Sequence, residues 1–358
     1  GVIGSLDLVF TKDLNAVYVR NINLPDPTFT ANGADNRPIY YKAFPSGTSN
    51  STTNTRINPN VTDAELMSNT SKGYSYFGTI QFKKAFNNGL DAMVAYTYTQ
   101  AQSVNDGGSI AQSVWRDRYV SGNPNANVLS YSSYLLQNRI IASLNYRKEY
   151  AGHFATSVGM FYSLAQSGRF SYSYSGDMNG DNSGGTNDLI YIPRNPSEIK
   201  LVDITGMDGS GNPYTYTAAQ QWADLDKYIS QDKYLSGRRG MYAERNGGIQ
   251  PWRGQLDLRI LQDFYVYVGK EKKKRNTLQL SLDIFNVGNL INNNWGLYQV
   301  PNRSSLLTFK GYDATGTPTF QYPYLNSSTK TPLTSTFRND LGLLSRWQMQ
   351  LGVRYIFD

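Results

Sequence analysis

The chain has 358 residues, one histidine, no cysteine and a formal net charge of +7. The missing cysteines exclude disulfides, thiolate metal sites and cysteine nucleophiles. No stretch approaches the roughly 18 consecutive apolar residues of a spanning helix, and a mean hydropathy of -0.49 agrees with that exclusion.

Segments in which apolar and polar residues alternate recur along the chain, and this period of two predicts two-faced β-strands. Eight such segments cover residues 5–23, 73–86, 90–102, 132–148, 154–174, 255–269, 277–286 and 346–357. In the last, one face carries Trp347, Met349, Leu351, Val353, Tyr355 and Phe357, and the other carries Arg346, Gln348, Gln350, Gly352 and Arg354. Most exceed the five or six residues usual in soluble strands, whereas about nine to eleven are needed to cross a bilayer.

The connections between these segments alternate in length. Residues 87–89, 150–153 and 270–275 are short turns, whereas 24–72, 103–131, 175–254 and 287–344 are long and rich in Asn, Ser, Gly, Thr and Pro. Short periplasmic turns alternating with long extracellular loops are typical of outer-membrane barrels. Tyrosine and tryptophan, which favour membrane interfaces, are frequent here as well. The predicted fold is therefore all-β: an antiparallel transmembrane β-barrel with about eight long strands and a periplasmic C-terminus.

The distribution of charge and the first residues of the chain each lead to one expectation. The densest basic run, residues 270–275, lies between two predicted strands, so we interpret it as a solvated turn and expect no nucleic-acid partner. Gly1 leads directly into a predicted strand without a signal peptide, so we expect either a processed N-terminus or a fragment.

The end of the chain carries a short recognisable pattern. Gln350, Gly352, Tyr355 and Phe357 resemble the C-terminal β-signal of outer-membrane proteins, in which aromatic residues stand three and five places after a glycine. The family pattern usually ends on the aromatic residue, whereas Asp358 follows here. The resemblance implies recognition by the barrel-assembly machinery.

Three further stretches, residues 6–13, 176–193 and 282–290, resemble the C-terminal barrel region of TonB-dependent receptors, particularly the Oar-like and SusC-like branch of the Bacteroidota. The resemblance implies a barrel of about 22 strands, an N-terminal plug and a TonB box. Residues 1–358 would then be the C-terminal section of the barrel domain, with the plug and the remaining strands upstream of Gly1. The resemblance also allows a surface lipoprotein as a partner.

The best candidate metal site is the segment 177–188, here called the Asn/Asp loop. Asp177, Asn179, Asp181 and Asp188 place oxygen ligands at positions that can converge on Ca²⁺, with Asn187 beside them. The loop departs from an EF-hand, because its sixth residue is Asn182 rather than glycine and its twelfth is aspartate rather than glutamate. The alternative is a loop that folds by side-chain to backbone hydrogen bonds.

Other candidates are weaker. Arg259 and Asp283 should face the lumen on neighbouring strands, either along a solute path or as a structural pair. Residues 115–119 and the aromatic residues Trp222, Tyr228, Tyr234 and Tyr242 lie in predicted external loops, where they suit either sugar or peptide contact or simple loop packing. His153 lies in a short turn and has no second histidine with which to build a metal site.

The leading functional hypothesis is an outer-membrane TonB-dependent transporter segment that supplies barrel wall, lumen lining and extracellular loops for uptake of a large solute. The alternative is a small structural or adhesive barrel that closes on itself, which requires the first and last strands to pair. An enzyme is not expected, because the sequence offers no Ser/His pairing beyond the turn histidine. A soluble surface β-sandwich remains a further alternative.

Overall fold

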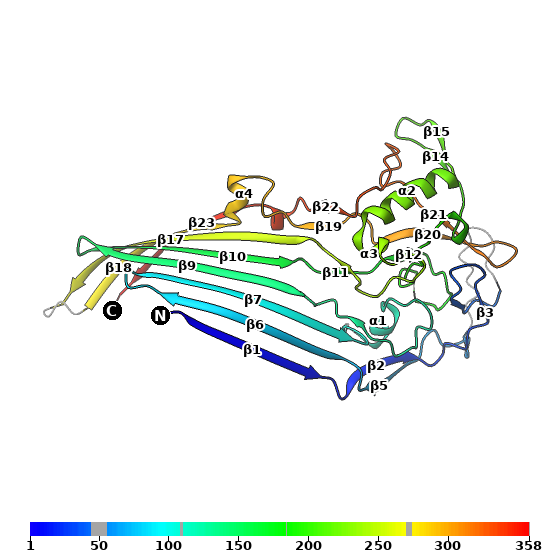
Figure 1. Ribbon diagram of the computed structural model, residues 1–358, viewed down its shortest axis with the longest axis horizontal. Helices are drawn as coiled ribbons and strands as arrows, with labels where there is room; N and C mark the ends of the chain where they lie inside the picture. Colours follow the sequence, from blue (N-terminus) through cyan, green and yellow to red (C-terminus); the bar gives the residue numbers. More distant parts are fainter. Residues whose placement is uncertain (44–55, 108–109, 184, 270–273, 358) are drawn as a thin grey trace.

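The computed structural model describes residues 1–43, 56–107, 110–183, 185–269 and 274–357, and these are mostly β-structure. The largest sheet is built from eight long antiparallel strands that follow one another in chain order (Figure 1). They are β1 (Ile3–Lys12), β6 (Tyr74–Ala85), β7 (Leu90–Ser103), β9 (Asn138–Tyr150), β10 (Phe154–Gln166), β17 (Trp252–Val268), β18 (Lys274–Phe285) and β23 (Gln348–Ile356), with the short β8 (Ser130–Tyr131) added at the end of β7. The prediction of a mostly β structure with a large antiparallel sheet is confirmed.

Short turns and long connections lie at opposite ends of this sheet, and both chain termini lie at the end with the short turns (Figure 1). In the turn after β6, Gly89 has φ +84°, and a Cβ there would lie 2.4 Å from the Arg147 carbonyl oxygen, so the turn requires glycine. In the turn after β9, His153 Nδ1 lies 3.1 Å from the Tyr265 carbonyl oxygen. Residues 270–273 of the basic turn and Asp358 lie outside the described residues.

Three predicted strands are shorter than the alternation indicates. The segment 132–148 joins the large sheet only at Asn138, where β9 begins. The segment 5–23 breaks at residues 13–15, and its second half, β2 (Ala16–Asn21), leaves the large sheet to pair with β5 (Glu65–Thr70). The segment 154–174 ends as β10 at Gln166 and continues, after Gly168 at φ +151°, as β11 (Arg169–Phe170) and β12 (Ser173–Ser175). The period of two persists when a chain changes partner, so it does not mark where a strand leaves its sheet.

The long connections fold together into what we call the loop region: the described residues of 13–73, 104–137, 167–251 and 286–347. Besides β2, β5, β8, β11 and β12 it contains β3 (Phe29–Thr30), β4 (Pro38–Ile39), β13 (Lys200–Leu201), β14 (Ile204–Met207), β15 (Pro213–Tyr216), β16 (Gly248–Ile249), β19 (Gln299–Pro301), β20 (Ser305–Tyr312), β21 (Pro318–Gln321), β22 (Phe337–Asn339), α1 (Ala111–Arg116), α2 (Ala218–Gln231), α3 (Lys233–Ser236) and α4 (Val287–Ile291), with 3-10 turns at Pro196–Glu198 and Leu343–Ser345. The described parts of the long connections are therefore folded segments rather than irregular chain.

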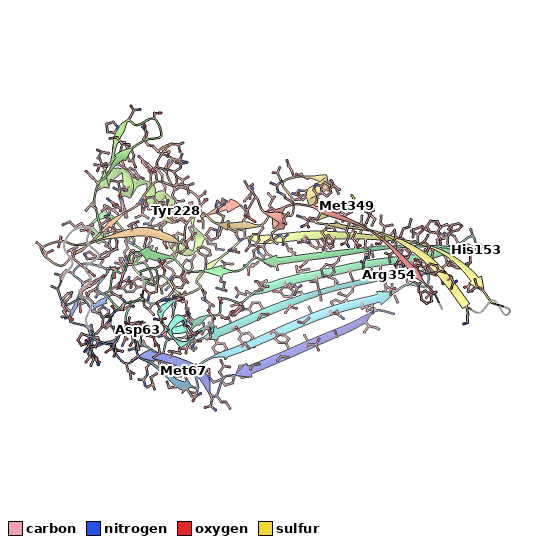
Figure 2. All side chains as sticks on the ribbon, turned by 180° about the vertical axis from the view of Figure 1, so that it is seen from behind. Asp63, Met67, His153, Tyr228, Met349 and Arg354 are labelled. Atoms are coloured by element: carbon pink, nitrogen blue, oxygen red, sulfur yellow. The ribbon has the colours of Figure 1, made fainter. Side chains whose placement is uncertain are left out.

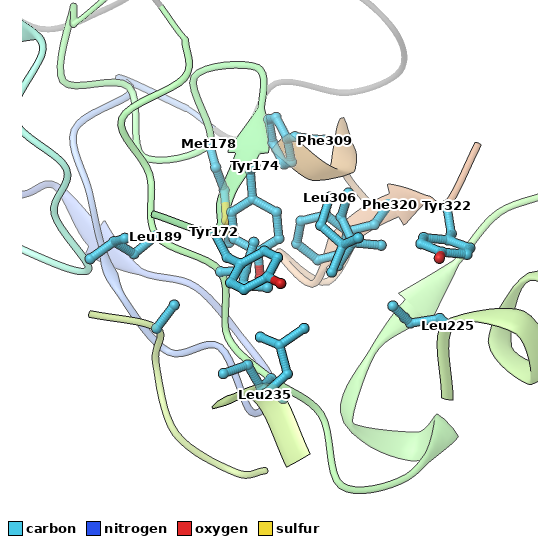
Figure 3. Close-up of a cluster of buried hydrophobic side chains, with 14 of the residues drawn as sticks. Tyr172, Tyr174, Met178, Leu189, Leu225, Leu235, Leu306, Phe309, Phe320 and Tyr322 are labelled. Carbon is cyan, nitrogen blue, oxygen red and sulfur yellow. The ribbon is translucent and has the colours of Figure 1, made fainter. Parts of the chain in front are cut away.

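The hydrophobic core lies in the loop region and is rich in tyrosine (Figure 3). Helix α2 illustrates how the sequence builds it. A capping box between Thr217 and Gln220 starts the helix, and Leu225, Tyr228 and Ile229 are its buried apolar face. Of these, Tyr228 packs against Tyr322, and the two ring centres are 6.3 Å apart. Among the described residues, no helix is both long enough and apolar enough to span a membrane.

The large sheet is open in the described part of the chain. Strands β1 and β23 are its two edges, and neither pairs with the other. A self-contained eight-stranded barrel, which the structural or adhesive alternative requires, is therefore not what the structure shows.

Candidate functional site

One face of the large sheet, here called the apolar face, carries large apolar side chains in rows that cross the strands. One row consists of Leu90, Tyr146, Val158, Ile260, Leu282 and Leu351, and the next consists of Ala92, Leu144, Met160, Leu258, Ile284 and Met349. The edge strands are the most exposed, with Leu8 at 74 % and Leu351 at 76 %. A continuous apolar surface of this kind indicates contact with lipid or with another protein.

Aromatic side chains mark both ends of the apolar face. Tyr150, Phe154, Phe264, Tyr355 and Phe357 lie near the short turns, and Phe10, Tyr76, Tyr98, Tyr162 and Trp347 lie near the long connections. Phe154 and Tyr162 stand eight residues apart on β10, which is roughly 26 Å of strand. Outer-membrane barrels carry an apolar band about 25 Å tall between two aromatic girdles, and because their strands tilt by about 35–45°, this length of strand would cover about 20 Å of that height.

The opposite face, here called the polar face, carries a network of charges. Arg147 Nη1 lies 3.1 Å from Asp263 Oδ2, and Arg147 Nη2 lies 3.2 Å from Glu149 Oε1. Gln279 donates a hydrogen bond to Asp263 at 2.8 Å, and Arg275 lies 3.5 Å from Glu149. Ion pairs that link β9, β17 and β18 on one face favour a wet environment on that side of the sheet.

The two predicted lumen residues are brought together on this polar face. Arg259 on β17 pairs directly with Asp283 on β18, and Arg259 Nε donates to Asp283 Oδ1 at 2.6 Å. The arginine side chain is 63 % exposed and the aspartate 13 %. The pair thus has both the neighbouring strands and the common face that the sequence predicted.

The four residues of the C-terminal pattern divide between the two faces of β23. Gln350 and Gly352 lie on the polar face, where a Cβ at Gly352 would stand 2.5 Å from Ser281 Oγ. Tyr355 lies on the apolar face, and its ring centre is 6.0 Å from that of Phe357. Strand β23 is an edge of the described sheet, so this pattern is presented on an unpaired edge. Figure 2 shows Met349 and Arg354 on the same strand.

The Asn/Asp loop is closed by hydrogen bonds between its own side chains and backbone. Asp181 Oδ2 accepts from the side-chain amides of Asn179 at 3.1 Å and Asn187 at 3.2 Å. Gly180 has φ +75°, and a Cβ there would lie 2.7 Å from the Tyr41 ring, so only glycine allows this close approach.

A buried arginine from a distant segment completes the loop. Arg37 Nη1 donates to Asp188 Oδ1 at 2.9 Å, and Arg37 Nε donates to Asp35 Oδ1 at 2.9 Å. Asp188 Oδ2 accepts from the backbone N–H groups of Met178 at 2.8 Å and Asn179 at 3.3 Å. The Arg37 and Asp188 side chains are both fully buried, and a buried charge requires such partners.

The loop holds more negative than positive charge. Burial raises the pKa of Asp188 to about 6, although the Arg37 guanidinium opposes this rise. Burial also raises the pKa of Asp177 well above its usual range, and the charges of Asp181 and Asp188 add to the effect. Within the described residues no group of three or more His, Cys, Asp or Glu side chains is arranged to hold a metal ion. Calcium at Asp177, Asn179, Asp181 and Asp188 stays a prediction, and the hydrogen bonds agree with the self-closed alternative.

Most of the predicted external aromatic residues take part in packing. Trp115 is 1 % exposed and Tyr228 is fully buried, while Trp222 and Tyr234 pack against the main core. Figure 2 shows Tyr228 in the loop region and His153 at the opposite end of the molecule. Tyr242 donates to Asp35 at 3.0 Å, so it belongs to the Arg37 network.

The sequence did not predict the distant residues that contact the side chains of the Asn/Asp loop. Arg37 is 151 residues away from Asp188, and no local pattern points to that contact. A scan against protein-family models, a search of curated proteins and a search of solved structures each find no match for this chain.

Proposed function

We propose that this chain is the C-terminal section of the outer-membrane barrel of a TonB-dependent receptor, and that it supplies wall, lumen lining and extracellular loops for uptake of a large solute. The observation that carries the proposal is the two-faced sheet. Its apolar face has aliphatic rows between aromatic ends, as a lipid-facing wall requires. Its polar face has ion pairs that suit a wet lumen.

The open edges fit a section of a larger barrel. Strands β1 and β23 each offer a row of unpaired backbone groups, which a membrane protein must satisfy with further strands. The short turns and both termini would then face the periplasm, and the loop region would face the outside. The chain would contact lipid and the barrel-assembly machinery directly, and it would couple to TonB through an upstream plug. A surface lipoprotein would be a further partner on the loop side.

The absence of cysteine makes the wall assignment directly testable. Leu144 lies on the apolar face of β9, and its neighbour Ser143 lies on the polar face. In outer membranes that contain the full-length protein, we expect a water-soluble maleimide to label Ser143→Cys at least about ten times faster than Leu144→Cys, because lipid excludes the reagent. Ser210→Cys, at an exposed loop position, serves as the fully labelled control. Equal rates at positions 143 and 144 would contradict a lipid-facing wall.

Transport requires a separate test. The coding sequence upstream of Gly1 is expected to encode a plug and a TonB box, and cells without TonB should keep the protein in the outer membrane but lose uptake. An upstream region that encodes neither element would overturn the transport assignment while leaving the wall assignment intact.

A further inference from the structure

Two cavities in the loop region lie on either side of a pair of buried arginines. One has a volume of about 340 Å³ and the other about 400 Å³, and both are lined by Arg118, Tyr119 and Arg245. The two arginines come from segments that are distant in the sequence. Arg118 follows helix α1, and Arg245 lies before β16. Both arginines line both cavities, so they form part of the wall between them.

Each arginine is only 6 % exposed, yet within the described residues neither lies within ion-pair distance of a carboxylate. Arg118 Nη2 donates to the Pro124 carbonyl oxygen, and Arg245 donates to the carbonyl oxygens of Ser103 and Val104. The Nε atoms of both arginines are buried without a hydrogen-bond partner. A buried guanidinium with an unused donor and no counter-charge is costly, so these positions need an explanation.

Arg37 shows what a compensated buried arginine looks like in the same chain. It contacts the carboxylates of Asp35 and Asp188, and its pKa is raised well above the usual value despite burial. In contrast, burial lowers the pKa of Arg245 to about 10; the charge of Asp106 opposes this shift and the charge of Arg118 adds to it. Burial lowers the pKa of Arg118 as well.

The acidic residues around the cavities are already engaged. Glu244 lies 3.2 Å from Arg238, and Asp117 lies 2.7 Å from Arg116. Asp106 accepts hydrogen bonds from Ser103 Oγ and Asn246 Nδ2, both at 3.0 Å. Of these, Asp106 opposes the lowering of the Arg245 pKa, but no carboxylate among the described residues lies within ion-pair distance of either arginine.

We propose that Arg118 and Arg245 bind the anionic group of a small organic ligand, a carboxylate or a phosphate, whose apolar part occupies the 340 Å³ cavity. A planar guanidinium forms charge-assisted hydrogen bonds to either group. The same cavity offers an apolar lining for the rest of the ligand: Val128, Leu129, Tyr131, Leu189 and Ala243. The site does not depend on transport, because it is formed by the loop region together with Gln102 at the end of β7.

The test is calorimetric titration of the purified full-length protein in detergent with sodium hexanoate, inorganic phosphate and 1-hexanol at constant ionic strength. We expect saturable binding of at least one anion, and an affinity at least about tenfold lower in Arg118→Met and in Arg245→Met, because a charge-assisted hydrogen bond is lost. Saturation by hexanoate alone assigns a carboxylate ligand, and saturation by phosphate alone assigns a phosphate ligand. 1-Hexanol should not distinguish the wild type from the variants.

Arg303→Met is the matched control. Its half-buried guanidinium also donates to main-chain carbonyls, those of Pro323 at 2.8 Å and Tyr324 at 2.7 Å, but it lines neither cavity. We expect it to retain full anion affinity. Arg118→Lys keeps the charge if the methionine variant fails to fold, and it should bind with intermediate affinity. The proposal is overturned if neither anion binds the wild type, if 1-hexanol binds as hexanoate does, or if Arg303→Met loses as much affinity as Arg118→Met.

Discussion

Arg259 Nε donates a hydrogen bond to Asp283 Oδ1 at 2.6 Å across the directly paired strands β17 and β18. The arginine is mostly exposed, and exposed ion pairs contribute little to stability because water screens them. We therefore expect Arg259→Gln to change the free energy of unfolding by less than about 1 kcal/mol, measured by urea unfolding in detergent. A loss of about 3 kcal/mol or more would show that the pair is shielded from water, against a solvated polar face.

Arg37 should behave in the opposite way. Its side chain is fully buried between Asp35 and Asp188, and removal of one partner leaves uncompensated buried charge. Arg37→Gln is expected to destabilise the loop region by about 3–5 kcal/mol, measured by the same urea unfolding. Arg116→Gln, which removes an exposed pair with Asp117, is the control and should leave the midpoint unchanged. Equal behaviour of the two variants would contradict the role of Arg37 as a buried clamp.

The contacts of Arg259 and Arg37 illustrate which parts of the structure the sequence could predict and which it could not. The strands, their two faces and the alternation of turns follow from a local period of two and from turn residues. The structure confirms them, except where the segments 5–23, 132–148 and 154–174 are shorter than predicted. The pairing of Arg259 with Asp283 follows the same logic, because only the few residues between Val268 and Lys274 separate β17 from β18, which limits the possible registers.

Contacts within the loop region, and sheet contacts whose register depends on it, could not be derived in this way. Arg147 and Asp263 are 116 residues apart, and the register between β10 and β17 is set by a folded connection rather than by a hairpin turn. The core likewise joins segments from three of the four long connections. These contacts depend on tertiary packing, which leaves no periodic signal in the sequence.

Asp188 gives the loop region a pH dependence with a defined sign. Burial raises its pKa from the usual 3.8 to about 6, so the folded state binds more protons than the unfolded state between these values. The free energy of unfolding should then fall as pH rises through that window. In chelator, we expect the melting temperature, followed by tryptophan fluorescence, to be a few degrees higher at pH 5 than at pH 7.5. Asp188→Asn should flatten this difference, and a rise in stability from pH 5 to 7.5 would contradict the assignment.

Calcium should stabilise the loop region most at a pH at which the carboxylates of the Asn/Asp loop are ionised. Among the described residues, Asp188 contacts Arg37, whereas Asp177 and Asp181 form no ion pair, and a divalent cation would favour the charged form of the three carboxylates. We expect millimolar CaCl₂ to raise the melting temperature relative to chelator at pH 7.5, and Asp181→Asn to abolish the rise. Asp117→Asn, in an exposed pair, is the control. An unchanged melting temperature would favour the loop that closes by its own hydrogen bonds.

The aromatic end of β23 should control assembly rather than stability. Tyr355 and Phe357 are 58 % and 76 % exposed beside an unpaired strand edge, so an assembly factor can contact both rings. We expect Phe357→Ser to lower the amount of folded protein in the outer membrane severalfold, measured by the migration of unheated and heated samples on gels. Ile356→Ser removes a neighbouring apolar side chain of the same strand outside the pattern, and it should assemble normally. Equal losses in the two variants would mean that general hydrophobicity, and not the Gln350/Gly352/Tyr355/Phe357 pattern, is recognised.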